Sequence, residues 1–426
     1  MGTFFSHASF DALRHRDYRI YIIARFFLTI AWNMQSVVFG WLIYAYTKDP
    51  MSLGLIGLAE AIPAVGIALF GGHLADRFNR KKLILILLFF MLVITLLLSA
   101  FTYNENDSFA RMGTFPLYFL IFLTGVARGL LSPSIAAFSA QLIPRQQFGN
   151  ASAWSSTVWQ LGAVTGPALG GFIYGFTNAF TASCSIGIFI GLTLVCYLFI
   201  KSRPLPEIHK SENLFESLVS GIRFVKNNNI MLSAISLDLF AVLFGGAVAL
   251  LPMFADQVLH TGAEGLGLLR AAPALGAVVM ALYLAYRPPM VNAGRTLLWA
   301  VGGFGMCMIL FALSRNFILS MTLLALSGML DAVSVVIRST IMQALTPDNM
   351  RGRVSAVNTI FIGSSNEIGA FESGLTARLM GLVPAVIFGG TMTLIVVLVG
   401  WKKSPALRTL NLNRILNESG DNGTGS

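Results

Sequence analysis

The chain has 426 residues, of which 55% are hydrophobic and only 11% are charged. Soluble domains carry about 25% charged residues, so this composition excludes a protein whose whole surface faces water. The net charge of +10 does not by itself indicate nucleic acid as a partner, because the positions of basic residues matter more than their sum when lipid is the surrounding medium.

Long apolar segments recur along the whole chain. A helix needs about 20 apolar residues to cross a bilayer, and a barrel would show short alternating segments instead. Backbone groups find no partners in lipid, so these segments must be helical. The sequence therefore predicts an all-α membrane protein with twelve spans, at about residues 19–46, 53–75, 82–103, 115–142, 151–176, 180–200, 230–257, 264–286, 294–314, 317–345, 353–378 and 381–401.

Lysine and arginine are distributed unevenly among the loops that join these spans. If the N-terminus is cytoplasmic, 21 of the 29 basic residues fall on the cytoplasmic side, four fall outside and four lie within spans. Cytoplasmic loops of membrane proteins carry such an excess. We therefore expect a multi-pass protein with both termini in the cytoplasm.

The longest polar segment, residues 201–229, divides the spans into six plus six. Its second part has apolar residues at helical spacing, which predicts an amphipathic helix at the membrane surface. The predicted organisation is an N-terminal six-helix bundle (1–200), this cytoplasmic linker, a C-terminal six-helix bundle (230–403) and a flexible cytoplasmic tail (404–426).

The two halves repeat each other. Residues 57–66 and 267–276 share the pattern G-L-x-x-A-x-P-A-x-G, and 143–153 resembles 346–356 in the loop after the fourth span of each half. Two related six-helix halves around a pseudo-two-fold axis are typical of secondary transporters. Spans 3, 6, 9 and 12 lack charged residues in their interiors, so we expect them to face lipid while most of the others line a cavity.

Charged and polar side chains occur inside several spans, where they are costly and normally face a bundle interior or a wet cavity. Those that recur at helical spacing or lie near mid-span are candidates for the substrate cavity: Arg25, Asn33, Arg128, Asp331, Arg338, Asn358 and Glu372. Glu60 and Asp238 are the first candidates for carrying a proton, followed by Asp331 and Glu372, because burial favours the neutral form of a carboxylate. Each of these residues could instead belong to a structural ion pair.

Two motifs resemble signatures of the major facilitator superfamily. "GGHLADRFNRKK" at 71–82 resembles the loop between spans 2 and 3, with Asn79 in place of the usual second glycine. "GAVTGPALGG" at 162–171 resembles the span 5 motif of the family's antiporters, which mostly export. The segments "FDALRHRDYRIYIIARFF" and "GLAEAIPA" are similar to the branch of transmembrane secretion effectors, which contains the enterobactin exporter. The resemblance covers essentially the whole chain and implies the major facilitator fold.

The resemblance also implies a role for each motif. In the loop it implies a cytoplasmic gate that holds the two halves together in the outward-open state, formed by Gly72, Asp76, Arg77 and Arg80. The alternative is that the loop serves topology alone. In span 5, proline kinks the helix and the glycines permit tight packing, which we expect against span 8; the residues are Gly162, Gly166, Pro167 and Gly170.

These features predict a secondary active transporter of the bacterial inner membrane. We expect a monomeric, proton-coupled exporter of small amphipathic molecules that works by alternating access. A catecholate siderophore and a lipophilic drug both fit the mixed charges of the spans. The alternatives are an importer or uniporter of a metal or small nutrient, a membrane-embedded lipid enzyme, and a receptor. The sequence shows no nucleophile–base constellation, nucleotide-binding loop or metal-ligand spacing, so we expect no enzyme, no cofactor, no metal site and no nucleic acid as partner.

We predict that Asp76→Asn lowers transport with little loss of folding. The substitution removes the charge that would hold the neighbouring arginines or the N-terminus of a neighbouring helix. Labelling of single cysteines placed between the halves on the cytoplasmic side should rise in the variant. Transport and labelling that both stay at wild-type levels would show that the loop serves topology alone.

Overall fold

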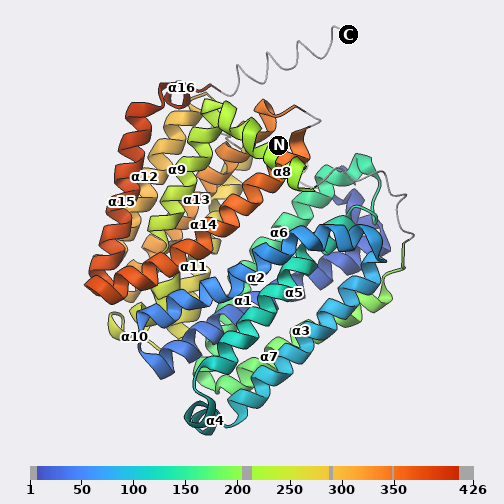
Figure 1. Cartoon of the computed structure of the whole chain (residues 1–426), viewed down its shortest axis with the longest axis vertical. Coiled ribbons are helices and arrows are strands. Elements are labelled where there is room, and N and C mark those ends of the chain that lie inside the picture. Colours follow the sequence, from blue (N-terminus) through green and yellow to red (C-terminus); the bar gives the residue numbers. More distant parts are fainter. Residues whose placement is uncertain (1–6, 204–213, 287–290, 348–349, 412–426) are drawn as a thin grey trace. The chain divides into compact units, whose positions relative to one another are not determined.

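The computed structural model describes residues 7–203, 214–286, 291–347 and 350–411 (Figure 1). Every regular element within these ranges is a helix, as predicted. Twelve of the described helices are the main elements of the fold: α1 (Arg16–Thr47), α2 (Pro50–Arg77), α3 (Arg80–Tyr103), α5 (Phe115–Ser139), α6 (Phe148–Phe176), α7 (Ala179–Phe199), α9 (Asn229–Gly245), α11 (Ala263–Tyr286), α12 (Ala293–Leu313), α13 (Phe317–Leu345), α14 (Arg351–Met380) and α15 (Leu382–Lys403).

Ten candidate spans in the described residues are long and apolar enough to cross a membrane. The two main helices outside this set are α6 and α14, which hold equivalent places in the two halves. Both are rich in glycine and serine, and α14 also carries Glu367 and Glu372. Polar spanning helices of this kind line protein interiors or wet cavities rather than lipid.

The predicted seventh span, 230–257, is not one continuous helix. After α9 ends at Gly245, the chain forms η3 (Ala247–Leu250) and α10 (Leu251–Gln257). Gly246 leaves the helical region with ψ 53°, and Pro252 stands in the first turn of α10, where its missing amide hydrogen is tolerated. The predicted span is confirmed at Asn229–Gln257, but the helix within it is interrupted at Gly246.

Shorter helices complete the described chain. They are η1 (His7–Arg14), α4 (Glu105–Met112), η2 (Arg145–Gln147), α8 (Leu214–Asn227) and α16 (Pro405–Arg408). The α8 helix lies in the linker where an amphipathic helix was predicted, and it packs on α9 and α14. The sequence did not indicate α4, which follows α3 directly.

The chain forms two compact units. Unit 1 comprises Met1–Lys48, Leu58–His209 and His260–Ala271, and the remainder of the chain forms unit 2. The bounds of these units differ from those of the predicted bundles (1–200 and 230–403) within α2 and α11. The first part of α2 belongs to unit 2, and the first part of α11 belongs to unit 1.

The same helix pairs pack in both units (Figure 1). In unit 1, α1 packs on α6 and α7, while α3 packs on α5 and α7; in unit 2, α9 packs on α14 and α15, while α12 packs on α13 and α15. One hydrogen bond is repeated as well. Thr193 Oγ1 donates to the Ala24 carbonyl, and Thr393 Oγ1 donates to the Ala241 carbonyl, each at 3.4 Å. These pairings support the internal repeat inferred from the sequence.

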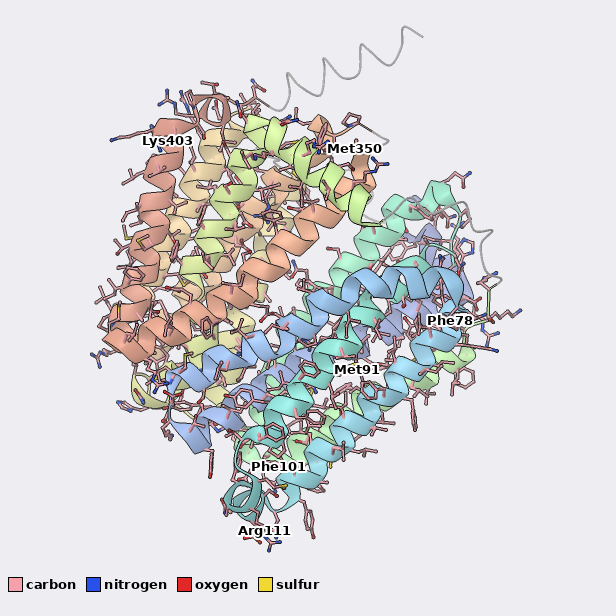
Figure 2. The ribbon with its side chains drawn as sticks, viewed as in Figure 1. Phe78, Met91, Phe101, Arg111, Met350 and Lys403 are labelled. Atoms are coloured by element: carbon pink, nitrogen blue, oxygen red, sulfur yellow. The ribbon has the colours of Figure 1, made fainter. Side chains whose placement is uncertain are left out.

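The chain was predicted to cross from one side of the membrane to the other with each successive span. The positions of labelled residues at the helix ends agree with this prediction (Figure 2). In unit 1, Phe78 and Arg111 lie at opposite ends, as expected for an inner and an outer loop. In unit 2, Met350 and Lys403 lie at the same end, as expected for two inner segments.

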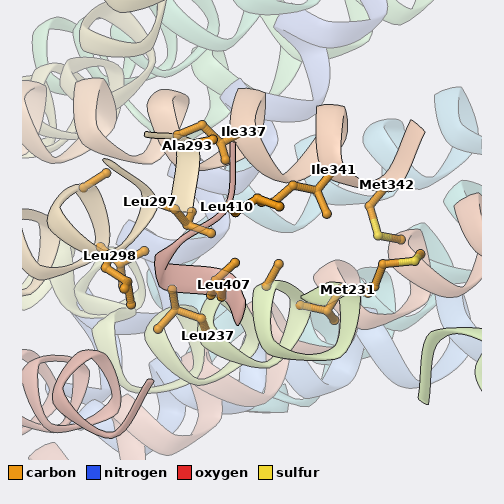
Figure 3. Packing of buried hydrophobic residues seen from close by; sticks show 14 of the residues in the cluster. Met231, Leu237, Ala293, Leu297, Leu298, Ile337, Ile341, Met342, Leu407 and Leu410 are labelled. Carbon is orange, nitrogen blue, oxygen red and sulfur yellow. The ribbon is translucent and has the colours of Figure 1, made fainter. Parts of the chain in front are cut away.

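A buried apolar cluster at one end of unit 2 includes residues after the last span (Figure 3). Leu407 and Leu410 are 1% and 5% exposed and pack with Leu297 and Ile341. The expected flexible tail, 404–426, therefore begins with a segment that is part of the core, because two leucines stand at positions that face it. Residues 412–426 lie outside the described residues.

Glycines allow equivalent helices to cross closely in both units. A Cβ atom at Gly125 of α5 would collide with the Glu60 carbonyl and the ring of Pro63 in α2. A Cβ atom at Gly328 of α13 would collide with the Pro273 carbonyl in α11. The Gly–Pro crossing thus occurs between the second and fourth helices of each half.

We predict that Gly125→Ala lowers the melting temperature of the detergent-solubilised protein. Overpacking a close contact costs about 1–3 kcal/mol. The matched control is Gly191→Ala in α7, where the added carbon meets no atom within 4 Å. It should leave the melting temperature unchanged or slightly higher, because alanine favours a helix more than glycine does. Equal melting temperatures of the two variants would contradict the close crossing.

Candidate functional site

A cavity of about 560 Å³ lies in unit 1 between α1, the end of α5 and the first half of α6. This volume falls in the range of small-molecule sites, which is about 300–1,000 Å³. Its lining combines aromatic rings, hydroxyl groups and one charged group, represented by Tyr18, Tyr21, Arg25, Ser152, Ser155 and Trp159.

Arg25 is the charged group of this cavity. Within the described part of the chain no carboxylate pairs with its guanidinium, and its buried Nε has no hydrogen-bond partner. Tyr18 is held in place beside it, because its hydroxyl donates to the Ala151 carbonyl at 2.7 Å. An unpaired guanidinium with five fixed donors suits a planar oxyanion, and the aromatic rings offer faces on which a flat ligand can pack.

Local sequence explains how these side chains meet. Tyr18, Tyr21 and Arg25 recur at steps of three and four residues, so they share one face of α1. On α6, Ser152 and Trp159 bracket further serines at the same spacing. Arg25 was predicted from the sequence, but its neighbours were not, although Ser152, Ser155 and Ser156 and this periodicity were visible there.

Arg128 is paired, in contrast to Arg25. Its Nη1 donates to a carboxylate oxygen of Glu60 on α2, and its Nη2 donates to the Trp32 carbonyl at 3.3 Å. The guanidinium also lies 4.9 Å from the centre of the Trp32 ring, which is a cation–π geometry. The predicted cavity residue and the predicted proton carrier of this half are therefore partners in one ion pair.

A second ion pair lies inside unit 2. Arg338 of α13 pairs with Asp238 of α9, and the two residues are 4% and 6% exposed. Breaking a buried pair leaves a charge without compensation, which costs about 3–5 kcal/mol. Asp238, the other first candidate for proton transfer, is thus also held by an arginine.

The other polar candidates of unit 2 occupy separate places. Asp331 lines a small cavity of about 20 Å³ with Asp238. Asn358 lines a larger cavity of about 430 Å³ between α13 and α14, and its buried Oδ1 has no partner in the described structure. Glu372 is half-buried and does not line any of these three cavities.

Asn33 in unit 1 has a local role. Its amide donates to the Thr29 carbonyl at 2.8 Å within α1, and its Cβ lies against Gly166 of α6. It therefore contributes to the contact between these two helices. Its predicted place in the substrate cavity stays a prediction.

Three residues of the predicted gate, Gly72, Asp76 and Arg77, belong to a part of α2 for which the structure describes only the backbone. Arg80 Nη1 donates to the Ala137 carbonyl at 3.1 Å, near the end of α5. Asn79 stands where the family has glycine and caps α3, because its Oδ1 accepts from the Lys82 amide at 3.2 Å. The Arg80 contact joins the start of α3 to the end of α5, and the gate itself stays a prediction.

The glycines of the span 5 motif pack differently from our expectation. Gly162 and Gly166 lie against Thr29 and Asn33, and Gly170 lies against the next residue of α1, Met34. All three glycines therefore face α1 rather than the eighth span. The close approach to α11 comes from the next glycine, where Gly171 meets residues 263–267. The motif therefore serves two helices, because adjacent residues of a helix point about 100° apart.

The comparison with known families establishes the class of protein. The sequence profile of the Major Facilitator Superfamily matches residues 21–370. The chain belongs to this family, and it is therefore a multi-pass membrane transporter of a small molecule rather than an enzyme.

Curated relatives include enterobactin exporters. EntS of Salmonella typhi is 28% identical over 392 residues, which cover 89% of this chain and 91% of that protein. EntS of Escherichia coli O1:K1 is 28% identical over 394 residues, which cover 90% of each chain.

Solved structures share the fold. A POT family transporter in complex with 5-aminolevulinic acid superposes with a TM-score of 0.71 at 13% identity, over 92% of this chain and 96% of that one. A bacterial homolog to the human lysosomal transporter Spinster gives 0.69 at 15% identity, over 94% and 98%. Together with the family match, this likeness confirms the predicted major facilitator fold.

We predict that Asp238→Asn and Arg338→Gln each lower the free energy of unfolding by about 3–5 kcal/mol. The double variant Asp238→Leu/Arg338→Met should lose much less than the sum, because an apolar pair of similar volume replaces a buried ion pair at little cost. Chemical unfolding in detergent measures all three.

Glu60→Gln serves as a comparison and should lower the free energy of unfolding by less. Each side chain of the Glu60–Arg128 pair is 23% exposed, and Arg128 keeps its contacts with Trp32 in the variant. Strictly additive losses in the double variant would contradict the pairing of Asp238 with Arg338.

Proposed function

We propose that this transporter is a proton-coupled exporter of small amphipathic molecules that carry an anionic, aromatic group, such as a catecholate. It would act as a monomer in a bacterial inner membrane, with both termini in the cytoplasm and with alternating access to the two sides. The observation that carries this proposal is the unit 1 cavity, where the unpaired Arg25 stands among aromatic and hydroxyl side chains.

The chemistry of the cavity favours an anion over a lipophilic cation. Arg25 brings a guanidinium group to the cavity, and none of the residues that line the cavity in the described structure is an acid that would attract a cation. Serine hydroxyls can both donate to and accept from a hydroxylated ring, while Tyr21 and Trp159 offer apolar surface. The enterobactin exporters among the relatives support the same class of cargo and the outward direction.

Anion recognition by Arg128 has less support. Its pairing with Glu60 neutralises its charge, and Trp32 covers the guanidinium. The specificity of the proposed site therefore depends on one arginine rather than on the two that the sequence offered.

Arg25→Lys tests the proposal, because it keeps the charge but loses the fork that binds two oxygens at once. We expect 2,3-dihydroxybenzoate to bind the purified variant more weakly by about 1–3 kcal/mol. Binding of ethidium, a lipophilic cation, should not weaken. Calorimetry or quenching of Trp159 fluorescence measures both ligands.

Flux in proteoliposomes with an imposed pH gradient tests coupling and direction. Gradient-driven transport of the catechol, reduced in Arg25→Lys, is the expected result. A panel in which cationic dyes are the only compounds transported would reject anion recognition and favour a drug exporter.

A further inference from the structure

The small cavity of unit 2 has the composition of a site for one positive charge. It lies between α9, α12 and α13 and measures about 20 Å³. Two carboxylates line it, Asp238 of α9 and Asp331 of α13, together with Ser334. A space of this size holds about one water molecule.

These two carboxylates share a single arginine. Arg338 pairs with Asp238, and no ion pair or side-chain hydrogen bond of Asp331 occurs in the part of the chain that the structure describes. When both acids are ionised, the group of Asp238, Asp331 and Arg338 therefore carries one net negative charge. One bound cation of unit charge makes it neutral.

Ser334 gives an independent indication that the cavity takes a ligand. Its side chain is 2% exposed and lines the cavity, yet its Oγ has no hydrogen-bond partner in the described structure. A buried hydroxyl without a partner is unfavourable. A water molecule or a protonated carboxyl group in the cavity would supply one.

The internal repeat shows that the acid is specific to the second half. Aligning the loop 143–153 with 346–356 places Arg128 and Asp331 at equivalent positions, and Gly125 and Gly328 then coincide as well. In unit 1 the residue at this position is neutralised by a partner on α2. In unit 2 it is an acid whose side chain has no partner among the described residues.

We propose that Asp331 is the proton-binding residue of this transporter, with the Asp238–Arg338 pair and Ser334 as its immediate surroundings. This inference rests on the proposed function, which requires a coupled proton but leaves its carrier open. It shifts the role from Glu60 and Asp238, since both of these acids are held by arginines.

The position of Asp331 explains how one proton could be exchanged and then retained. It is the central residue of α13, and its side chain lines the small cavity while it keeps some exposed surface in the described structure. Binding forms one O–H bond on the carboxylate, with the proton taken from water. A neutral group can then be enclosed during the transport cycle, whereas enclosing a net charge in a membrane is costly.

Other charged groups near this site are engaged elsewhere. The α12 helix contributes only apolar residues to the cavity, and α9 contributes Asp238. On α11, which crosses α13 at Pro273, Arg270 donates to Ser36 of α1.

The α14 helix carries further charged groups, among them Arg353, Glu367 and Glu372. Arg353 donates to Ser220 at 3.2 Å, and Glu367 lies against Gly57 of α2. Glu372 is half-buried, and its carboxylate has no partner in the described residues, so it is the rival carrier.

Infrared difference spectroscopy between mildly acidic and mildly alkaline buffer tests the site on the full chain in lipid nanodiscs, without any cargo. We expect the wild-type protein to show the C=O band of a protonated carboxylic acid that disappears at alkaline pH. Asp331→Asn should lose this band, Asp331→Glu should retain one at a shifted frequency, and Asp107→Asn in α4 should match the wild type. Melting temperatures identify variants that fail to fold.

Three results would overturn the proposal. The band could persist in Asp331→Asn, it could vanish in Glu372→Gln instead, or it could respond to sodium at constant pH, which would identify a metal-cation site. Flux separates this inference from the proposed function. Gradient-driven catechol transport that survives in Asp331→Asn leaves the exporter intact and rejects Asp331, whereas a titrating Asp331 without gradient-driven transport rejects proton-coupled export alone.

Discussion

A charged side chain inside a membrane must be paired with an opposite charge or kept in contact with water. The described structure meets this constraint in two ways. Glu60 and Arg128 neutralise each other in unit 1, and Asp238 and Arg338 do so in unit 2. Arg25 has no such partner within the described residues and opens instead into a cavity of about 560 Å³. Pairing thus separates charges that hold helices together from charges that are available to a ligand.

The two units share the same helix packing, and this packing determines where the unpaired charged residues lie. Equivalent helix pairs pack in both units, and glycines bring α5 onto α2 and α13 onto α11 through the same Gly–Pro crossing. On this common frame the two halves carry different chemistry, because each half has its own polar residues at matching positions. We infer a division of labour in which unit 1 recognises the anionic part of the cargo and unit 2 binds the proton.

The fold could be predicted from the sequence more completely than the site. The lengths of the apolar segments and the bias of basic residues indicated twelve helices, because the bilayer imposes both patterns. The loop repeat indicated that these helices form two halves. The break at Gly246 and the packing of Leu407 escaped prediction, because they depend on tertiary contacts. Arg25 and Arg128 look alike in sequence, and the structure distinguishes them, because pairing is decided by helices far apart in the chain.

The most direct test of this account is a structure of the protein with a brominated dihydroxybenzoate, whose bromine can be located without ambiguity. The account predicts that the ligand lies in the unit 1 cavity, with its carboxylate or catechol oxygens within hydrogen-bond distance of Arg25 and its ring beside Tyr21 or Trp159. A ligand bound elsewhere, with the Arg25 guanidinium still unoccupied, would contradict the claim that the unpaired arginine recognises the cargo.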